Sequence, residues 1–145
     1  MNIAIFDLQH FEMVHVLHHV FNSPQNNVTF FTNKSLINKV KDSSLTSSPY
    51  TSVIEEDSTS IDAFFQKCLE AIQEKKIEFI VFNTIDVHYK STWNFVKQLN
   101  IPVFITIHNI NTWLKPPFTL NRLALSNYYY RKKIISKTSG LIVQE

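Results

Sequence analysis

Short apolar runs rich in β-branched and aromatic residues alternate with helical patterns along this chain of 145 residues, and this alternation limits the fold more than any other feature. The runs typical of strands are Ile3 to Phe6, Val28 to Phe31, Ile77 to Phe82, Val103 to Ile107 and Leu141 to Val143. Apolar residues fill these runs instead of alternating with polar ones, which indicates strands buried on both faces of a parallel sheet. We therefore expect an α/β fold with right-handed connections.

Amphipathic patterns lie between the strands. The clearest extends from Ile61 to Ile72, where apolar residues recur at helical spacing. Further helices are expected at His10 to Phe21, Thr32 to Lys41, Ser91 to Leu99 with Asn100 as its cap, and Thr119 to about Thr138, and a weak strand at Thr51 to Ile54. Together they predict one Rossmann-like domain over residues 1–145, a three-layer sandwich with a mainly parallel sheet in strand order 3-2-1-4-5-6.

Composition excludes several classes of protein. A net charge of +2 is too small for a nucleic-acid-binding domain, in which a basic stripe is expected. Cys68 is the only cysteine, which rules out an internal disulfide and favours a cytoplasmic location. It falls on the apolar face of its helix, so we expect a buried, inert thiol. No window approaches the roughly 20 apolar residues of a membrane span.

His108 is the strongest candidate for a site residue, because it follows a buried strand directly. Open parallel sheets bind ligands at the carboxyl ends of their strands. An imidazole there could hydrogen-bond a hydroxyl or anionic oxygen of a ligand, or exchange a proton near neutral pH. It could instead satisfy carbonyl groups of its own loop. Asn109 comes next and belongs to the same expected crevice.

Polar residues also follow two other strands. The turn after the first strand reads DLQHFE and contains no glycine, so we do not expect a backbone cradle for a phosphate there, although His10 could line the crevice. Asn83 and Asp86 follow a strand as well. They could hydrogen-bond a polyol, or they could be ordinary turn formers.

Two helical faces carry charge. Glu12, His15 and His19 share one face, but the HExxH spacing is missing, so a solvated surface is favoured and no metal site is expected. On the last helix, tyrosines adjoin basic residues, a pattern that suits an anionic membrane surface or a plain solvated helix. The candidates for membrane contact are Tyr128, Arg131, Lys132 and Lys133.

The strand that ends near Asn83, the segment IPVFITIHNI, the long basic helix and the closing KTSGLIVQE carry a family resemblance over nearly the whole chain. Their order resembles the N-terminal domain of GT-B glycosyltransferases, which have two Rossmann-like domains, and especially the retaining enzymes that use nucleotide sugars. In that family a similar segment ends in a histidine that reaches the sugar between the domains. The resemblance implies this role for His108, although the glycine pair of the family's first turn is missing here.

The resemblance further implies a cytoplasmic domain, peripheral at the inner membrane face, that binds a glycan, polyol or lipid-linked acceptor. Asn109, His10, Asn83 and Asp86 would shape the cleft. No cofactor is expected in this domain, because a C-terminal domain beyond Glu145 would bind the nucleotide-sugar donor, and the domain alone would be inactive. A non-catalytic Rossmann-like partner or regulatory module is the alternative. A receiver-type signalling domain is weaker, since no acidic cluster accompanies Asp7.

Overall fold

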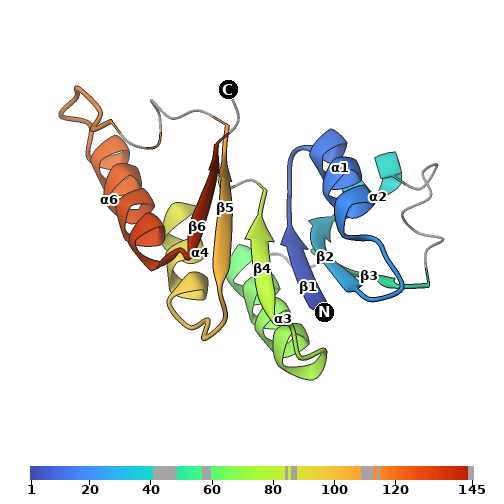
Figure 1. The fold of residues 1–145 in the computed structure, drawn as a ribbon. Helices are drawn as coiled ribbons and strands as arrows, with labels where there is room; N and C mark the ends of the chain where they lie inside the picture. The colour runs from blue at the N-terminus through green and yellow to red at the C-terminus, as the bar shows by residue number, and fades with distance from the viewer. Residues whose placement is uncertain are drawn as a thin grey trace.

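The fold is a six-stranded sheet with helices on both faces (Figure 1). The structure is a computed structural model, which describes residues 1–40, 49–56, 60–83, 85, 88–108, 113 and 115–143. Its strands are β1 (Asn2–Phe6), β2 (Asn27–Asn33), β3 (Thr51–Glu56), β4 (Phe79–Phe82), β5 (Val103–Ile107) and β6 (Gly140–Val143). Its helices are α1 (Phe11–Phe21), α2 (Lys34–Val40), α3 (Ile61–Glu74), α4 (Tyr89–Val96) and α6 (Arg122–Lys137).

The strand order is β3-β2-β1-β4-β5-β6 and every pairing is parallel. This confirms the Rossmann-like order predicted from the sequence. β1 is central, since Ile3 pairs with Val28 on one side and with Phe79 on the other. The chain builds outward from β1 to β3, crosses back through α3 and then continues from β4 to β6. The order therefore reverses between β1 and β4, at the place where sheets of this kind bind ligands.

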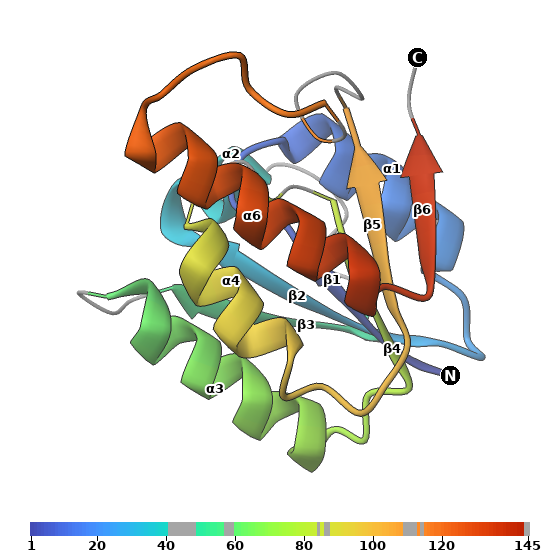
Figure 2. The same ribbon diagram turned by 90° about the vertical axis from the view of Figure 1, so that its left-hand side faces the viewer.

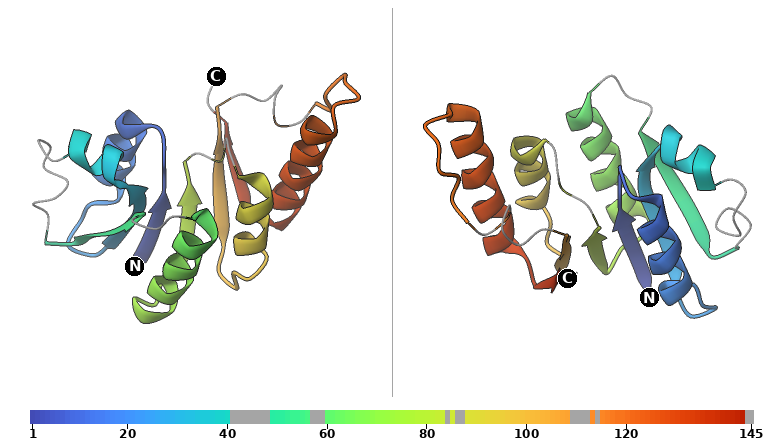
Figure 3. Two further views of the ribbon diagram at one scale, coloured as in Figure 1. Left: turned by 180° about the vertical axis from the view of Figure 1, so that it is seen from behind. Right: turned by 90° about the horizontal axis from the view of Figure 1, so that it is seen from above.

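The two faces of the sheet differ in how well they are covered. α3, α4 and α6 form one layer, whereas α1 and α2 lie on the opposite face (Figures 2 and 3). The larger core lies beneath the three-helix layer, where Phe65 stacks on Phe95 with ring centroids 4.7 Å apart. The smaller core, on the side of α1 and α2, contains Ile5, Val28, Phe30 and Leu36. β1 and β2 are thus packed on both sides.

The described part of the chain covers one face of β4, β5 and β6 and leaves the other face open. On the side of α1, an apolar cavity of about 410 Å³ is lined by Phe21, Glu78, Phe79, Val81, Pro102, Phe104 and Ile142. The residues Leu141, Ile142 and Val143 are 41%, 42% and 47% exposed. The expectation that this last run is buried on both faces is therefore wrong, because β6 is an edge strand with one open face.

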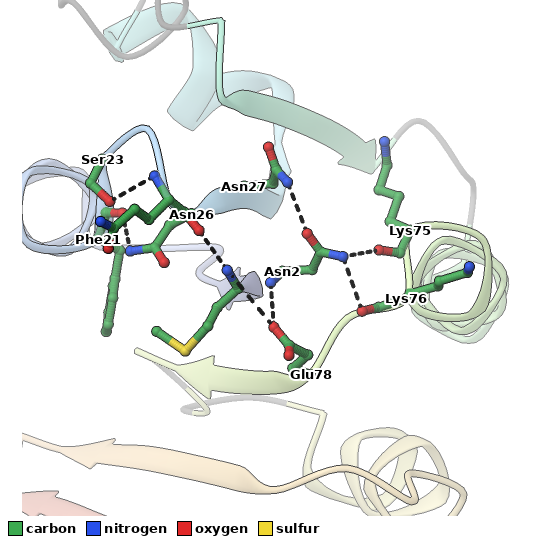
Figure 4. Close-up of polar contacts among 10 residues, drawn as sticks. Asn2, Phe21, Ser23, Asn26, Asn27, Lys75, Lys76 and Glu78 are labelled. Carbon is green, nitrogen blue, oxygen red and sulfur yellow. Dashed lines mark hydrogen bonds and ion pairs between the residues drawn. The ribbon is translucent and has the colours of Figure 1, made fainter.

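At the amino edge of the sheet, side-chain hydrogen bonds join the start of β1 to the start of β2 and to the segment between α3 and β4 (Figure 4). The amide nitrogen of Asn2 donates to the carbonyl oxygens of Lys75 and Lys76 at 2.9 and 3.3 Å, and its amide oxygen accepts from Asn27 at 2.9 Å. The backbone N–H of Asn2 donates to the Glu78 carboxylate at 2.7 Å. Asn2 thereby holds β1 against β2 and the turn after α3.

Helix ends differ in detail from the predicted ones. α4 begins at Tyr89 and has Lys97 as its C-terminal cap, so the prediction of Asn100 as the cap is wrong. α6 is capped by Asn121, whose side-chain oxygen accepts from the backbone N–H groups of Leu123 and Ala124. Thr119, the predicted cap, instead accepts a hydrogen bond from the backbone N–H of Asn121. Asn is among the strongest N-cap residues, which explains the later start.

Candidate functional site

Three polar residues directly follow three adjacent strands, at the edge to which the strand arrows point in Figure 1. Asp7 follows β1, Asn83 follows β4 and His108 follows β5. The sheet pattern continues through the first two, because the backbone N–H of Asn83 donates to the carbonyl of Phe6 at 2.9 Å. The ends of β1, β4 and β5 thus place these side chains next to one another, beside the point where the strand order reverses.

Asp7 and Asn83 form a buried pair at the base of the site. Both residues are fully buried, and the amide nitrogen of Asn83 donates to the Oδ2 atom of Asp7. The other carboxylate oxygen accepts from the backbone N–H groups of Gln9 and His10 at 2.8 and 3.0 Å. In a phosphate-binding turn, such N–H groups point at the ligand. Here an internal carboxylate already occupies them.

His108 and His10 adjoin this pair. Both imidazoles are half-buried, and their ring centroids are 5.0 Å apart. The Nε2 atom of His108 lies 2.8 Å from the backbone carbonyl oxygen of Asn83. A carbonyl oxygen only accepts, so Nε2 carries the hydrogen, and in the neutral ring Nδ1 is an acceptor. Within the described residues no contact occupies Nδ1, which leaves it available to a hydroxyl donor.

The side-chain oxygen of Asn83 is a second acceptor at this site. Because the carboxylate of Asp7 accepts hydrogen bonds, the amide nitrogen of Asn83 must face it, and this fixes the orientation of the amide group. Its oxygen, Oδ1, is buried and has no hydrogen-bond partner within the part of the chain that the structure describes. A buried acceptor without a donor typically costs about 1–3 kcal/mol. Unpartnered buried polar atoms are uncommon in native proteins, which makes this one a notable feature of the cluster.

The structure brings together three of the residues that the sequence singled out: His108, His10 and Asn83. Asn109 and Asp86 lie outside the described residues. One member of the site, Asp7, was not among the predicted ligand-binding residues. Its signal was present, since it follows the first buried strand and begins the turn that lacks glycine. The pattern could not show that its carboxylate turns inward to meet Asn83.

The predicted membrane-contact residues on α6 do not share one environment. Lys132 is exposed, while Tyr128 and Lys133 are half-buried. Arg131 is buried, and its guanidinium carbon lies 5.3 Å from the centroid of the Tyr89 ring on α4. The prediction that Arg131 contacts a membrane is therefore wrong. Its side chain packs between helices because its position on α6 faces α4.

No group of three or more His, Cys, Asp or Glu side chains among the described residues is arranged to hold a metal ion. The same part of the chain contains no helix that is both long enough and apolar enough to span a bilayer. Cys68 is buried in the larger core, as predicted.

The fold and the four side chains define a class of site: a polar cluster at the carboxyl edge of a Rossmann-like sheet, made of two imidazoles beside a buried carboxylate–amide pair. Comparison with models of known protein families gave no match, and comparison with curated proteins gave none either.

Proposed function

We propose that this domain binds the acceptor of a glycosyltransferase, a glycan, polyol or lipid-linked acceptor, and that His108 contacts the sugar that is transferred from a nucleotide-sugar donor. The nucleotide sugar would be held by a second, C-terminal domain, and the enzyme would act in the cytoplasm at the inner membrane face. In this proposal His10 and Asn83 line the acceptor crevice, together with Asn109 and Asp86.

The observation that carries the proposal is the hydrogen bond between Nε2 of His108 and the backbone of Asn83. It holds the ring in place and leaves Nδ1 as an acceptor in the neutral form. Ligand hydroxyl groups donate hydrogen bonds to such acceptors. An acceptor held in a fixed orientation at the carboxyl edge of the sheet suits a ligand that is rich in hydroxyls.

The first turn argues against a nucleotide phosphate at this position. The N–H groups of Gln9 and His10 already donate to Asp7, and a phosphate would have to displace a buried carboxylate to reach them. Two anions at one place repel each other, so this exchange is unfavourable. A neutral sugar or polyol meets no such repulsion. The domain is therefore better suited to an acceptor than to a diphosphate donor.

An NMR titration of the chain with maltose, sorbitol and UDP-glucose tests the proposal. We expect the amide shifts caused by maltose or sorbitol to cluster at residues 7–10, 83 and 108. His108→Ala should raise the Kd about tenfold, the effect of losing roughly one hydrogen bond to a ligand. His19→Ala, at an exposed position on α1, is the matched control and should leave the Kd unchanged.

Transfer kinetics provide the second readout where the donor-binding domain is present. His108→Ala should lower kcat/KM at least about tenfold, because it removes an interaction with the transferred sugar. If kcat/KM changed by less than about threefold, His108 would have no part in catalysis.

A non-catalytic partner or regulatory module is the second candidate. It is favoured by the way in which Asp7 occupies the amides of the first turn and His108 satisfies a loop carbonyl, since both contacts are complete without a ligand. The titration separates the two candidates. If none of the three ligands causes shifts around His108, the regulatory module becomes the better explanation.

A further inference from the structure

Large apolar side chains are exposed where the chain enters α6. Phe118 and Leu120 are fully exposed, Leu123 is 69% exposed and Leu125 is 44% exposed. We call these four residues the α6 corner. Single exposed apolar residues are ordinary on protein surfaces, but here four fall within eight consecutive positions. Phe118 and Leu120 precede the helix, and Leu123 and Leu125 lie at its start.

The surroundings of the α6 corner are basic. Lys115 and Arg122, both exposed, lie on either side of Phe118 and Leu120 in the chain. The wider sequence is one-sided too, because no Asp or Glu occurs between Val87 and Gln144. The eight basic residues in this stretch are Lys90, Lys97, Lys115, Arg122, Arg131, Lys132, Lys133 and Lys137. The small net charge of the chain is therefore the sum of a basic C-terminal part and an acidic N-terminal part.

Tyrosines continue the pattern along α6. Tyr129 is half-exposed, and the ammonium group of Lys133 lies 4.7 Å from the centroid of its ring. The ammonium group of Lys132 lies 6.0 Å from the ring centroid of Tyr128. Aromatic rings with an apolar body and a polar end, next to lysines, suit the boundary between lipid headgroups and acyl chains.

The α6 corner lies at the same edge of the molecule as the candidate site. The segment that leads into α6, orange in Figure 1, stands at the edge to which the strand arrows point. A flat surface that contacts the corner would therefore lie on the same side of the molecule as the end of β5, which His108 follows. If the domain binds a lipid-linked acceptor, as proposed above, this arrangement presents the acceptor's headgroup to the site.

We propose that the α6 corner docks the domain on an anionic membrane surface. Its apolar side chains insert at the headgroup boundary, and Lys115 and Arg122 contact lipid phosphates. This docking proposal specifies which residues make the membrane contact named in the proposed function. It depends on the proposed function only for the identity of the acceptor. Charge complementarity favours lipid over the alternatives: a nucleic acid offers no apolar phase for Phe118 and two leucines, whereas an anionic bilayer offers both an apolar phase and phosphates.

Vesicle flotation tests the inference with the intact chain. We expect binding to phosphatidylcholine vesicles that contain about 30% phosphatidylglycerol and much weaker binding to phosphatidylcholine alone. The triple variant Phe118→Ser, Leu120→Ser, Leu123→Ser should lower the partition coefficient at least about tenfold. The matched control is Val16→Ser with Val20→Ser, at positions on α1 that are 51% and 65% exposed, and it should bind as the wild type does.

A charge-reversal pair tests the basic part. Lys115→Glu with Arg122→Glu should abolish the preference for anionic vesicles, whereas Lys76→Glu with Lys97→Glu, exposed positions in the turns that precede β4 and β5, should keep it. The inference fails if the corner variants bind like the wild type, or if the chain ignores vesicles and binds a single-stranded oligonucleotide or a second copy of itself through the corner.

The two proposals fail separately. Loss of vesicle binding with retained maltose shifts around His108 would overturn the membrane inference alone. Vesicle binding without shifts from maltose or sorbitol would overturn the acceptor site alone. His108→Ala should not change flotation, because the imidazole takes no part in docking.

Discussion

Asp7 is a carboxylate held inside the protein by N–H donors. The described hydrogen bonds come from the backbone of Gln9 and His10 and from the side chain of Asn83. Burial of a charge is costly unless hydrogen bonds replace its hydration. The amide of Asn83 is therefore part of what allows Asp7 to remain buried. At the scale of single residues, this pair sets the base of the site.

Asn83→Asp tests this role through its dependence on pH. The change places a second carboxylate against Asp7, and two adjacent carboxylates cannot both remain ionised without a large cost. The folded variant must therefore bind a proton that the unfolded chain releases, so its free energy of unfolding falls as pH rises above about 4. We expect a loss of roughly 3 kcal/mol at pH 7.5, and a clearly smaller loss at pH 4.5, in urea titrations.

Asn83→Ala is the control for this measurement. It removes the donor without adding a charge, so it should cost about 1–3 kcal/mol relative to the wild type, with little difference between the two pH values. Equal losses for Asn83→Asp at both pH values would contradict the inward orientation of Asp7.

The sequence predicted the edge of the sheet on which the candidate residues lie better than it predicted the contacts between them. His108, His10 and Asn83 could be assigned to one edge, because each comes near the end of a strand and parallel strands end together. The contact between Asp7 and Asn83 depends on the register of β1 against β4, which no pattern reveals. Arg131 was misplaced for a similar reason. A run of Tyr, Arg and Lys suggests an exposed surface, but packing of α6 against α4 decides which of these residues turns inward.

At the scale of elements, strands were easier to predict than helix ends. All five of the predicted runs match a strand within one or two residues, because dense apolar composition is unusual outside a buried sheet. Helix ends depend on a single side chain finding a backbone N–H, and Thr119 and Asn121 are both capping residues. Asn121 succeeds because its oxygen reaches two N–H groups, those of Leu123 and Ala124.

Substitution of Asn121 should loosen the start of α6. Asn121→Ala removes both cap hydrogen bonds and should cost about 1 kcal/mol, with faster hydrogen exchange in the first turn of the helix. Asn121→Asp keeps the acceptor and adds a charge that favours a helix N-terminus, so it should preserve stability. A loss of the same size in both variants would show that the side-chain oxygen is not the capping group. Exchange followed by NMR distinguishes these outcomes.

At the scale of the whole molecule, the two faces of the sheet carry hydrophobic cores of different size. The three-helix layer covers the larger core, which contains Phe6, Phe64, Phe65, Phe82 and Phe95 in successive ring contacts. On the opposite face, the described residues form a core only near α1 and α2. Stability should therefore depend chiefly on docking of α3, α4 and α6 against the sheet.

Cys68 reports on this docking, because its thiol is buried in the larger core from the middle of α3. A reagent such as DTNB can reach it only when α3 leaves the sheet. If that requires global unfolding, labelling in native buffer should be at least about a thousandfold slower than in urea, as expected for a stability of 5 kcal/mol or more. Ser126→Cys in a Cys68→Ala background provides an exposed thiol that should react at once. Rapid labelling of Cys68 in the native protein would mean that α3 opens independently, and that the larger core does not unfold together with the rest of the protein.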